Sequence, residues 1–292
     1  MNQQINYQAS QIKVAALQMV STHDVASNMQ QAQRLVAKAA AEGAVIVVLP
    51  ENFAVFDSQA LYQWSQPEKA LLLTTQVSSW AKACGVWIIA GTLPRSDSYP
   101  DQADTVSGKR VRASSMVFTP QGDMCARYDK IHLFDVDVDD AYGCYRESET
   151  IEPGTSPTLV TVHIDNDICL KIGLSICYDL RFPELYRELS RQGADILVVP
   201  AAFTWETGKA HWEPLLRARA IENQCFVVAA NQGGQHSKTR QTWGHSMVID
   251  PWGEVLAQQK AGEGVVMAVI DIERQTALRT QMPVLQHRRL SM

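Results

Sequence analysis

Three residues of the sequence have the side chains that hydrolysis of an amide through a cysteine requires: Glu51, Lys130 and Cys177. A thiolate can attack a carbonyl carbon, a carboxylate can take up the thiol proton, and an ammonium can stabilise the oxyanion that forms. Alone, each has an ordinary alternative, since most cysteines belong to the core and a glutamate after a strand usually lies in a solvated turn. In combination they predict a cysteine nucleophile with one acid–base partner and one electrostatic partner.

The segment KIGLSICYDLRFPE, residues 171–184, predicts a strand that leads directly into a helix, with Cys177 at the junction. Its first half has the alternation of a strand, and Pro183 suits the first helical turn, where its missing N–H costs nothing. Backbone N–H groups at such a junction stabilise a thiolate and an oxyanion formed beside it. A buried structural cysteine remains the alternative.

Glu51 follows the apolar run VIVVL at residues 45–49, which is typical of a strand covered on both faces. A carboxylate at the end of such a strand loses hydration and becomes a better proton acceptor. Lys130 leaves an expected hairpin, in which residues 114–119 and 124–128 flank the turn sequence PQGD. The two charged residues are therefore expected at the ends of separate strands.

The elements that must position these residues predict an α/β fold. KVAALQ…VIVVLPEN near the start resembles KIGLSIC…DILVVPAAF in the middle, each a strand, a helix and an apolar strand with proline at its end. This repeat predicts two similar half-domains with a site between them, although two βαβ units can also resemble each other by chance. Expected helices are 24–42, 67–84, 183–192 and 211–223; expected strands are 13–18, 45–49, 86–93, 114–119, 124–128, 159–164, 168–176, 195–199, 225–230, 246–250, 254–257 and 265–271; residues 95–110 and 129–157 are expected to be loops.

Composition argues against several other classes of function. The 292 residues are 46% hydrophobic, enough for a large core, and carry a net charge of −5, which does not favour nucleic acid or an anionic membrane. No signal peptide and no membrane-spanning run of roughly 20 apolar residues is expected. The six cysteines are scattered without a CxxC pair, so neither disulfides nor a metal site are expected. Free cysteines are typical of a reducing compartment, and we therefore expect a cytoplasmic location.

Three blocks of sequence resemble the nitrilase, or carbon–nitrogen hydrolase, superfamily: LPEN at 49–52, YDKIHLFD at 128–135 and GLSICYDLRFPEL at 173–185. The resemblance extends over about residues 12 to 290. It implies a four-layer α-β-β-α sandwich that is at least dimeric. It also implies one carbon–nitrogen hydrolase domain over residues 1–292, with a core at about 12–272 and a C-terminal tail at 273–292, and it implies no cofactor.

The resemblance also implies roles for particular residues. Glu51 would be the general base, Lys130 the cation that stabilises the oxyanion, Cys177 the nucleophile, and the backbone N–H of Tyr178 a further oxyanion donor. A second glutamate is implied after the lysine, for which we choose Glu147, with Glu149 and Glu152 as alternatives. Substrate-binding roles are implied for Arg181, Phe203 and Thr207, and Arg181 could instead form a salt bridge at the helix start.

The segment from His211 to Val255 resembles the deaminated glutathione amidase branch of the family. The implied substrate is a small amide with a 2-oxoglutaryl end, whose carboxylate Arg181 could bind with two hydrogen bonds. An ω-amidase acting on 2-oxoglutaramate is the related alternative, and acyl transfer to an acceptor other than water is a further one. A non-catalytic binding scaffold on the same fold is the alternative from a different class.

Overall fold

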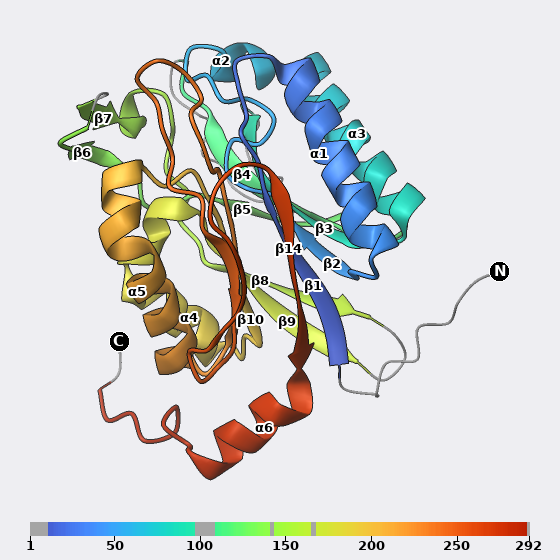
Figure 1. The fold of residues 1–292 in the computed structure, drawn as a ribbon, viewed down its shortest axis with the longest axis vertical. Helices are drawn as coiled ribbons and strands as arrows, with labels where there is room; N and C mark the ends of the chain where they lie inside the picture. The colour runs from blue at the N-terminus through green and yellow to red at the C-terminus, as the bar shows by residue number, and fades with distance from the viewer. Residues whose placement is uncertain (1–10, 97–108, 141–142, 165–167, 291–292) are drawn as a thin grey trace.

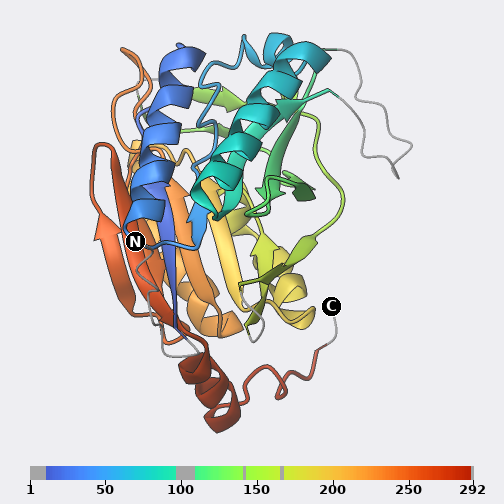
Figure 2. The same ribbon diagram turned by 90° about the vertical axis from the view of Figure 1, so that its right-hand side faces the viewer.

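The computed structural model of the protein describes residues 11–96, 109–140, 143–164 and 168–290. Two six-stranded sheets pack face to face, and helices cover the outer face of each, so that the chain forms four layers (Figure 1). In the view turned by 90°, helices α1 (Val25–Ala41) and α3 (Pro67–Cys84) lie side by side on the outside of the first sheet (Figure 2). The four-layer α-β-β-α sandwich expected from the sequence is confirmed.

The two sheets repeat one arrangement of strands. Read as β14-β1-β2-β3-β4-β5 and β8-β9-β10-β11-β12-β13, both show antiparallel, parallel, parallel, antiparallel and antiparallel pairings. The repeat in the sequence therefore corresponds to a repeat in the structure, with β9 in the place of β1 and β10 in that of β2. The strands are β1 (Gln11–Gln18), β2 (Ile46–Val48), β3 (Trp87–Arg95), β4 (Arg112–Phe118), β5 (Met124–Asp129), β8 (Thr158–His163), β9 (Cys169–Leu174), β10 (Ile196–Ala201), β11 (Phe226–Asn231), β12 (Ser246–Ile249), β13 (Val255–Gln259) and β14 (Gly264–Asp271).

The helices on each side begin and end where local chemistry dictates. The side chain of Asp24 caps α1 by accepting hydrogen bonds from the first backbone N–H groups, and Gly85 ends α3 with φ +65°. Helix α4 (Pro183–Arg191) begins with a proline, as the sequence predicts. Helix α5 (Trp205–Asn223) lies with α4 on the outside of the second sheet. It begins six residues before the expected start.

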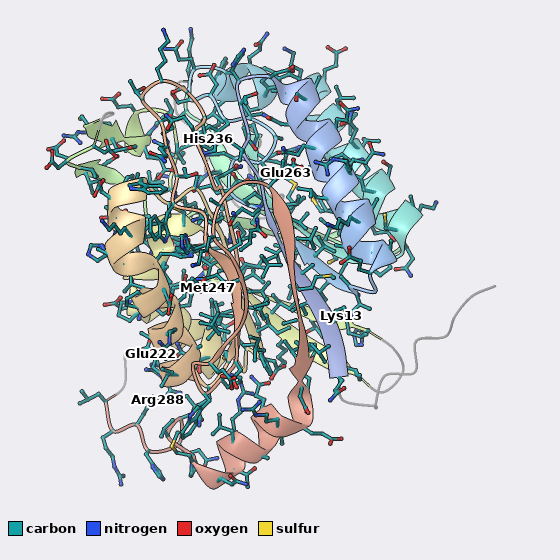
Figure 3. All side chains as sticks on the ribbon, viewed as in Figure 1. Lys13, Glu222, His236, Met247, Glu263 and Arg288 are labelled. Atoms are coloured by element: carbon teal, nitrogen blue, oxygen red, sulfur yellow. The ribbon has the colours of Figure 1, made fainter. Side chains whose placement is uncertain are left out.

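Alternate residues of β1 belong to different clusters of the hydrophobic core. Val14 and Ala16 belong to a cluster that extends from the two sheets to α4 and α5, whereas Ala15 and Leu17 belong to the cluster under α1 and α3. The fully buried Met247, labelled in Figure 3, belongs to the first of these clusters. Both faces of the central strands are thus covered, which is why these strands are continuously apolar in the sequence.

Two expected irregular segments contain regular structure. Residues 129–157, expected to be a loop, include the short hairpin β6 (Asp135–Asp137) and β7 (Cys144–Arg146) and the 3₁₀ helix η1 (Glu147–Glu149). The tail expected after residue 272 begins with helix α6 (Ile272–Gln281), held by the buried side chain of Gln275. Both were missed because polar contacts rather than apolar periodicity hold them. Most of the loop expected at 95–110 lies outside the described residues.

Candidate active site

Lys130 lies between two glutamates at the end of the first sheet. Its Nζ is 2.8 Å from Oε1 of Glu51 and 2.8 Å from both carboxylate oxygens of Glu147. The Lys130 side chain is only 2% exposed, so these ion pairs form away from water. Burial by itself lowers the pKa of the ammonium, but the negative charges of Glu147 and Glu51 outweigh it and raise the pKa well above its ordinary value. Lys130 is therefore positively charged at neutral pH.

The Glu51 carboxylate is fixed from both sheets. It follows β2, and its Oε2 accepts a 2.9 Å hydrogen bond from the backbone N–H of Ala202, which follows β10 of the second sheet. The side chain of Gln232 donates to the backbone carbonyl of Glu51 at 3.1 Å. A Cβ at Gly91, where φ is +23°, would lie 1.9 Å from the carbonyl oxygen of Pro50, so only glycine allows β3 to approach this turn. The Glu51 carboxylate therefore has little freedom to move.

Cys177 begins a short 3₁₀ helix, η2 (Cys177–Arg181), which is separated from the end of β9 by two residues. Its φ of +47° is rare for a residue with a side chain and costs on the order of 1–3 kcal/mol. Burial raises the pKa of the thiol well above its ordinary value and the charge of Glu51 raises it further, whereas Lys130 and the Ala202 N–H lower it. Cys177 is thus a thiol next to the Glu51 carboxylate, to which a thiol proton could pass.

The Glu147 carboxylate lies at the start of η1. Its Oε2 accepts a 2.7 Å hydrogen bond from the backbone N–H of Phe134, in addition to the contacts with Lys130. Burial raises the pKa of Glu147, while the positive charge of Lys130 opposes this rise. Of the three candidate glutamates, Glu147 is the one that binds the lysine, whereas Glu152 forms a salt bridge with Arg110.

Asp179 connects the loop that carries the lysine to the junction that carries the cysteine. Its buried Oδ2 accepts from the Tyr128 hydroxyl at 2.7 Å and from the Ile176 N–H at 2.8 Å. Its Oδ1 accepts from the backbone N–H of His132 at 3.1 Å and lies 2.7 Å from Nδ1 of that ring, which stacks on Phe182. One carboxylate therefore sets the distance between two parts of the site that are far apart in the sequence.

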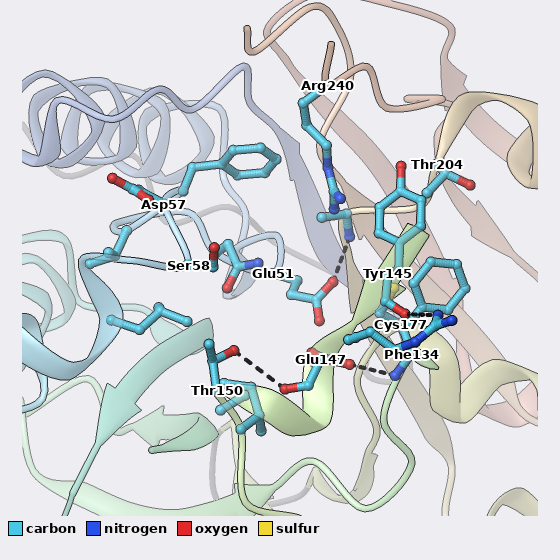
Figure 4. Close-up of a pocket in the computed structure, with 18 of the residues that line it drawn as sticks. Glu51, Asp57, Ser58, Phe134, Tyr145, Glu147, Thr150, Cys177, Thr204 and Arg240 are labelled. Carbon is cyan, nitrogen blue, oxygen red and sulfur yellow. Dashed lines mark hydrogen bonds between the residues drawn. The ribbon is translucent and has the colours of Figure 1, made fainter. Parts of the chain in front are cut away.

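Glu51, Lys130, Glu147 and Cys177 line a cavity of about 670 Å³. Figure 4 shows Glu51, Glu147 and Cys177 gathered at its base, with Tyr145 and Arg240 along one side. Such a volume suits a small-molecule ligand.

Among the residues that the structure describes, no three His, Cys, Asp or Glu side chains are arranged to hold a metal ion. Within the same ranges, no helix has both the length and the apolar character needed to cross a bilayer.

The structure brings together most of the site residues predicted from the sequence. Glu51, Lys130, Glu147 and Cys177 line the cavity, as do three further predicted residues, Tyr178, Phe203 and Thr207. Arg181 is not among the lining residues. Its guanidinium lies over the rings of Tyr178 and Phe203 and 3.2 Å from Nδ1 of His211.

Sequence reasoning missed three residues that matter to the site: Asp179, Gln232 and Arg240. Asp179 lies in the same block as Cys177, and a fully buried carboxylate so close to the nucleophile could have been noticed as a polar residue in an apolar context. Gln232 acts on Glu51 from 181 positions further along the chain, and no local signal predicts that contact. Arg240 lies on a polar loop, and no local signal in the sequence indicates that its side chain reaches the cavity.

The chain belongs to the carbon–nitrogen hydrolase family, whose model matches residues 13–280. It is 42% identical to the deaminated glutathione amidase of Yersinia enterocolitica and 44% identical to that of Synechocystis sp., each over 94% of this chain and over 92% and 97% of the relative. The ω-amidase NIT2 of Danio rerio is 37% identical over 96% of this chain and 95% of its own.

Solved structures of the family have the same architecture. Saccharomyces cerevisiae Nit3, a member of the nitrilase superfamily, matches with a TM-score of 0.81 and 30% identity, over 96% of this chain and 97% of Nit3. The C. elegans NitFhit protein matches with a TM-score of 0.83 and 36% identity, over 96% of this chain and 65% of that one. The chain is thus a carbon–nitrogen hydrolase that acts on amides.

Proposed function

We propose that this protein hydrolyses deaminated glutathione to 2-oxoglutarate and cysteinylglycine through a thioester on Cys177. The observation that carries the proposal is the buried Lys130 ammonium between the carboxylates of Glu51 and Glu147, next to the Cys177 thiol. The names of the two bacterial relatives support the choice of substrate. Burying such a cluster costs several kcal/mol of desolvation free energy per ion before the attraction between the charges offsets it. A non-catalytic scaffold does not require buried charges of this kind, so the cluster favours an enzyme.

In the proposed reaction, Glu51 takes the thiol proton while Sγ of Cys177 attacks the amide carbon. Lys130 and the backbone N–H of Tyr178 stabilise the oxyanion, and Glu147 keeps the Lys130 ammonium in place. The C–N bond then breaks and Glu51 gives the proton to the leaving nitrogen. Water loses a proton to Glu51 as it attacks the thioester, the C–S bond breaks, and the proton returns to sulfur. The products are a carboxylic acid and an amine.

The 2-oxoglutaryl carboxylate is proposed to pair with Arg181, with Phe203 and Thr207 beside the acyl chain. The Arg181 guanidinium lies 5.7 Å from the ring centre of Tyr178 and 5.3 Å from that of Phe203, and both rings line the cavity. Because its Nη1 is directed to His211, the side chain must turn inward to reach a substrate. Arg181→Lys should then slow hydrolysis of the carboxylate-bearing amide and leave an analogue with a methyl group in its place little affected.

The direct test is steady-state hydrolysis of deaminated glutathione and of 2-oxoglutaramate by the purified protein, with Cys177→Ala as the inactive control. The proposal requires higher kcat/KM for deaminated glutathione. Higher kcat/KM for 2-oxoglutaramate would instead favour an ω-amidase, the second candidate, which the Danio rerio relative supports. Turnover of neither substrate, or equal turnover by Cys177→Ala, would contradict the proposal.

We further propose that the protein is a homodimer or a larger homo-oligomer in the cytoplasm. Two large apolar side chains, Ile221 at 45% and Trp252 at 62%, are exposed around the end of α5, and such neighbouring exposed groups are common at interfaces. All six cysteines are free, three of them exposed, which suits a reducing compartment. Sedimentation velocity with Trp252→Glu tests the oligomer, since a monomeric wild type would contradict it.

A further inference from the structure

Arg240 reaches the active-site cavity from a part of the chain that supplies none of the reacting groups. It lies on the loop that follows β11, and in Figure 4 its side chain points down into the cavity beside Tyr145. The centre of its guanidinium is 4.8 Å from the ring centre of Tyr145 and 5.8 Å from that of Phe56. Two aromatic rings from different segments therefore hold a positive charge at the cavity wall.

The loop around Arg240 is anchored rather than free to swing. His236 stacks on Phe56 with ring centres 4.0 Å apart, its Nδ1 lies 2.7 Å from the carbonyl oxygen of Ser21, and its Nε2 lies 2.7 Å from Oγ1 of Thr242. Because a carbonyl only accepts, Nδ1 carries the proton and Nε2 accepts from the threonine. The backbone N–H of His236 also donates to the carbonyl of Arg240, which fixes the base of the arginine.

The positive charge on this wall of the cavity is carried by Arg240 and not by His236. Burial, helped by the charge of Arg240, lowers the pKa of His236 to about 4 despite the opposing hydrogen bond to Ser21, so the imidazole is neutral at pH 7. A guanidinium stacked on rings keeps its N–H groups in its own plane, where a carboxylate accepts two of them.

We propose that Arg240 forms a subsite for a carboxylate on the leaving amine of the substrate. The inference rests on the proposed function, in which the acyl end lies toward Arg181, Tyr178 and Phe203. Arg240 lies on a different wall, built by Phe56 and Tyr145, so it is placed for the other end of the molecule. Deaminated glutathione carries a second carboxylate on its glycine, whereas the leaving group of 2-oxoglutaramate is ammonia. Arg240 thus selects peptide-like amides over the simple amide.

The position of the subsite also determines which kinetic step depends on it. The amine leaves when the thioester forms, so deaminated glutathione and 2-oxoglutaramate give the same acyl-enzyme. Arg240 therefore stabilises the substrate and the transition state of acylation, whereas the glycine carboxylate has already left with the amine when the thioester is hydrolysed. Loss of the arginine is expected to lower kcat/KM and the rate of acylation, but not the rate of deacylation.

The test compares the wild type, Arg240→Gln and Lys238→Gln on deaminated glutathione and on its analogue with glycinamide in place of glycine. Lys238 is exposed on the same loop and does not line the cavity, so its variant removes the same charge without touching the subsite. Arg240→Gln should lower kcat/KM for deaminated glutathione about 10- to 100-fold, as expected for one charge-assisted contact, and lower that for the glycinamide analogue less than about threefold. Lys238→Gln should change neither.

Three results would overturn the inference. If Arg240→Gln slows both substrates by the same factor, the arginine supports the fold or the acyl end and does not bind the glycine carboxylate. If it slows neither, Arg240 binds no part of the substrate. If the wild type hydrolyses neither peptide-like substrate, the proposed function itself fails, and the inference falls with it; this result is distinct because it appears before any substitution at Arg240.

Discussion

Replacing Lys130 with methionine should expose how the buried charges of the active site are balanced. The substitution keeps much of the side-chain volume but removes the cation that lies 2.8 Å from Glu51 and 2.8 Å from Glu147. Two carboxylates then face each other in a site from which water is excluded, and like charges so placed cannot both remain ionised. One of them, in our expectation Glu147, must take up a proton when the protein folds.

The expected cost is large because only one partner of a buried ion cluster is removed. Such a substitution typically lowers the free energy of unfolding by about 3–5 kcal/mol. For a chain somewhat shorter than this one, each kcal/mol of lost stability lowers the melting temperature by about 2–4 °C. The melting temperature should therefore fall by roughly 6–20 °C. Turnover should fall by about 10²–10³-fold, as for loss of one group that stabilises the oxyanion.

The pH dependence distinguishes this account from simple loss of packing. Burial already raises the pKa of Glu147 in the wild type, and removing Lys130 raises it further. A carboxyl with a raised folded-state pKa binds more protons folded than unfolded, so the variant loses stability as the pH rises from about 4 through that folded-state pKa. In the wild type the pKa of Lys130 is held well above its usual range, so its contribution persists through neutral pH. The stability difference between the proteins should therefore widen from pH 5 to pH 8.

The assay is denaturant unfolding followed by circular dichroism at pH 5, 6.5 and 8, for the wild type, Lys130→Met and the double variant Lys130→Met/Glu147→Gln. The double variant removes one of the two facing carboxylates, so it should recover most of the lost stability at pH 8 and remain inactive. An equal stability loss at pH 5 and pH 8, or no recovery in the double variant, would refute the reasoning about paired charges.

Other substitutions test the nucleophile, the base and the groups that position them. Rapid quenching during turnover should give an acyl adduct on the Cys177 peptide by mass spectrometry, and activity in Cys177→Ala would contradict this. Glu51→Gln should remain folded by circular dichroism and lose about 10²–10⁴-fold in kcat; near-wild-type turnover would remove it from the mechanism. Asp179→Asn, which places an amide N–H₂ against hydrogen-bond donors, should cost at least about 3 kcal/mol in denaturant unfolding and lower kcat more than it changes KM. Gly91→Ala forces a Cβ against the carbonyl of Pro50 and should cost about 1–3 kcal/mol in the same assay, and an unchanged unfolding midpoint would show that the turn yields.

Local sequence patterns determined most of the regular structure of this protein. Short apolar runs such as residues 45–49 are typical of strands buried on both faces, and residues such as Asp24, Gly85 and Pro183 mark helix ends through their own chemistry. The repeat between the two halves was visible because each βαβ unit places its apolar residues at the same spacing. The hairpin of β6 and β7 was not predicted because polar contacts such as that of Arg146 with Asp137 leave no apolar alternation. Helix α6 was not predicted because Gln275 binds the carbonyls of Asp195 and Gln224, far away in the chain.

The candidate site was predictable in its residue types and not in its geometry. Glu51, Lys130 and Cys177 stand out because each follows a strand, but only the packing of the two sheets brings the Ala202 N–H from the second onto the carboxylate from the first. The family resemblance favoured Glu147 over Glu149 and Glu152, but only the tertiary structure shows that the Glu147 carboxylate contacts the lysine. The tertiary structure also places Arg240 in the cavity and Arg181 beside it. The sequence could not show this, because contacts of a guanidinium with an aromatic ring from a distant segment leave no periodic pattern.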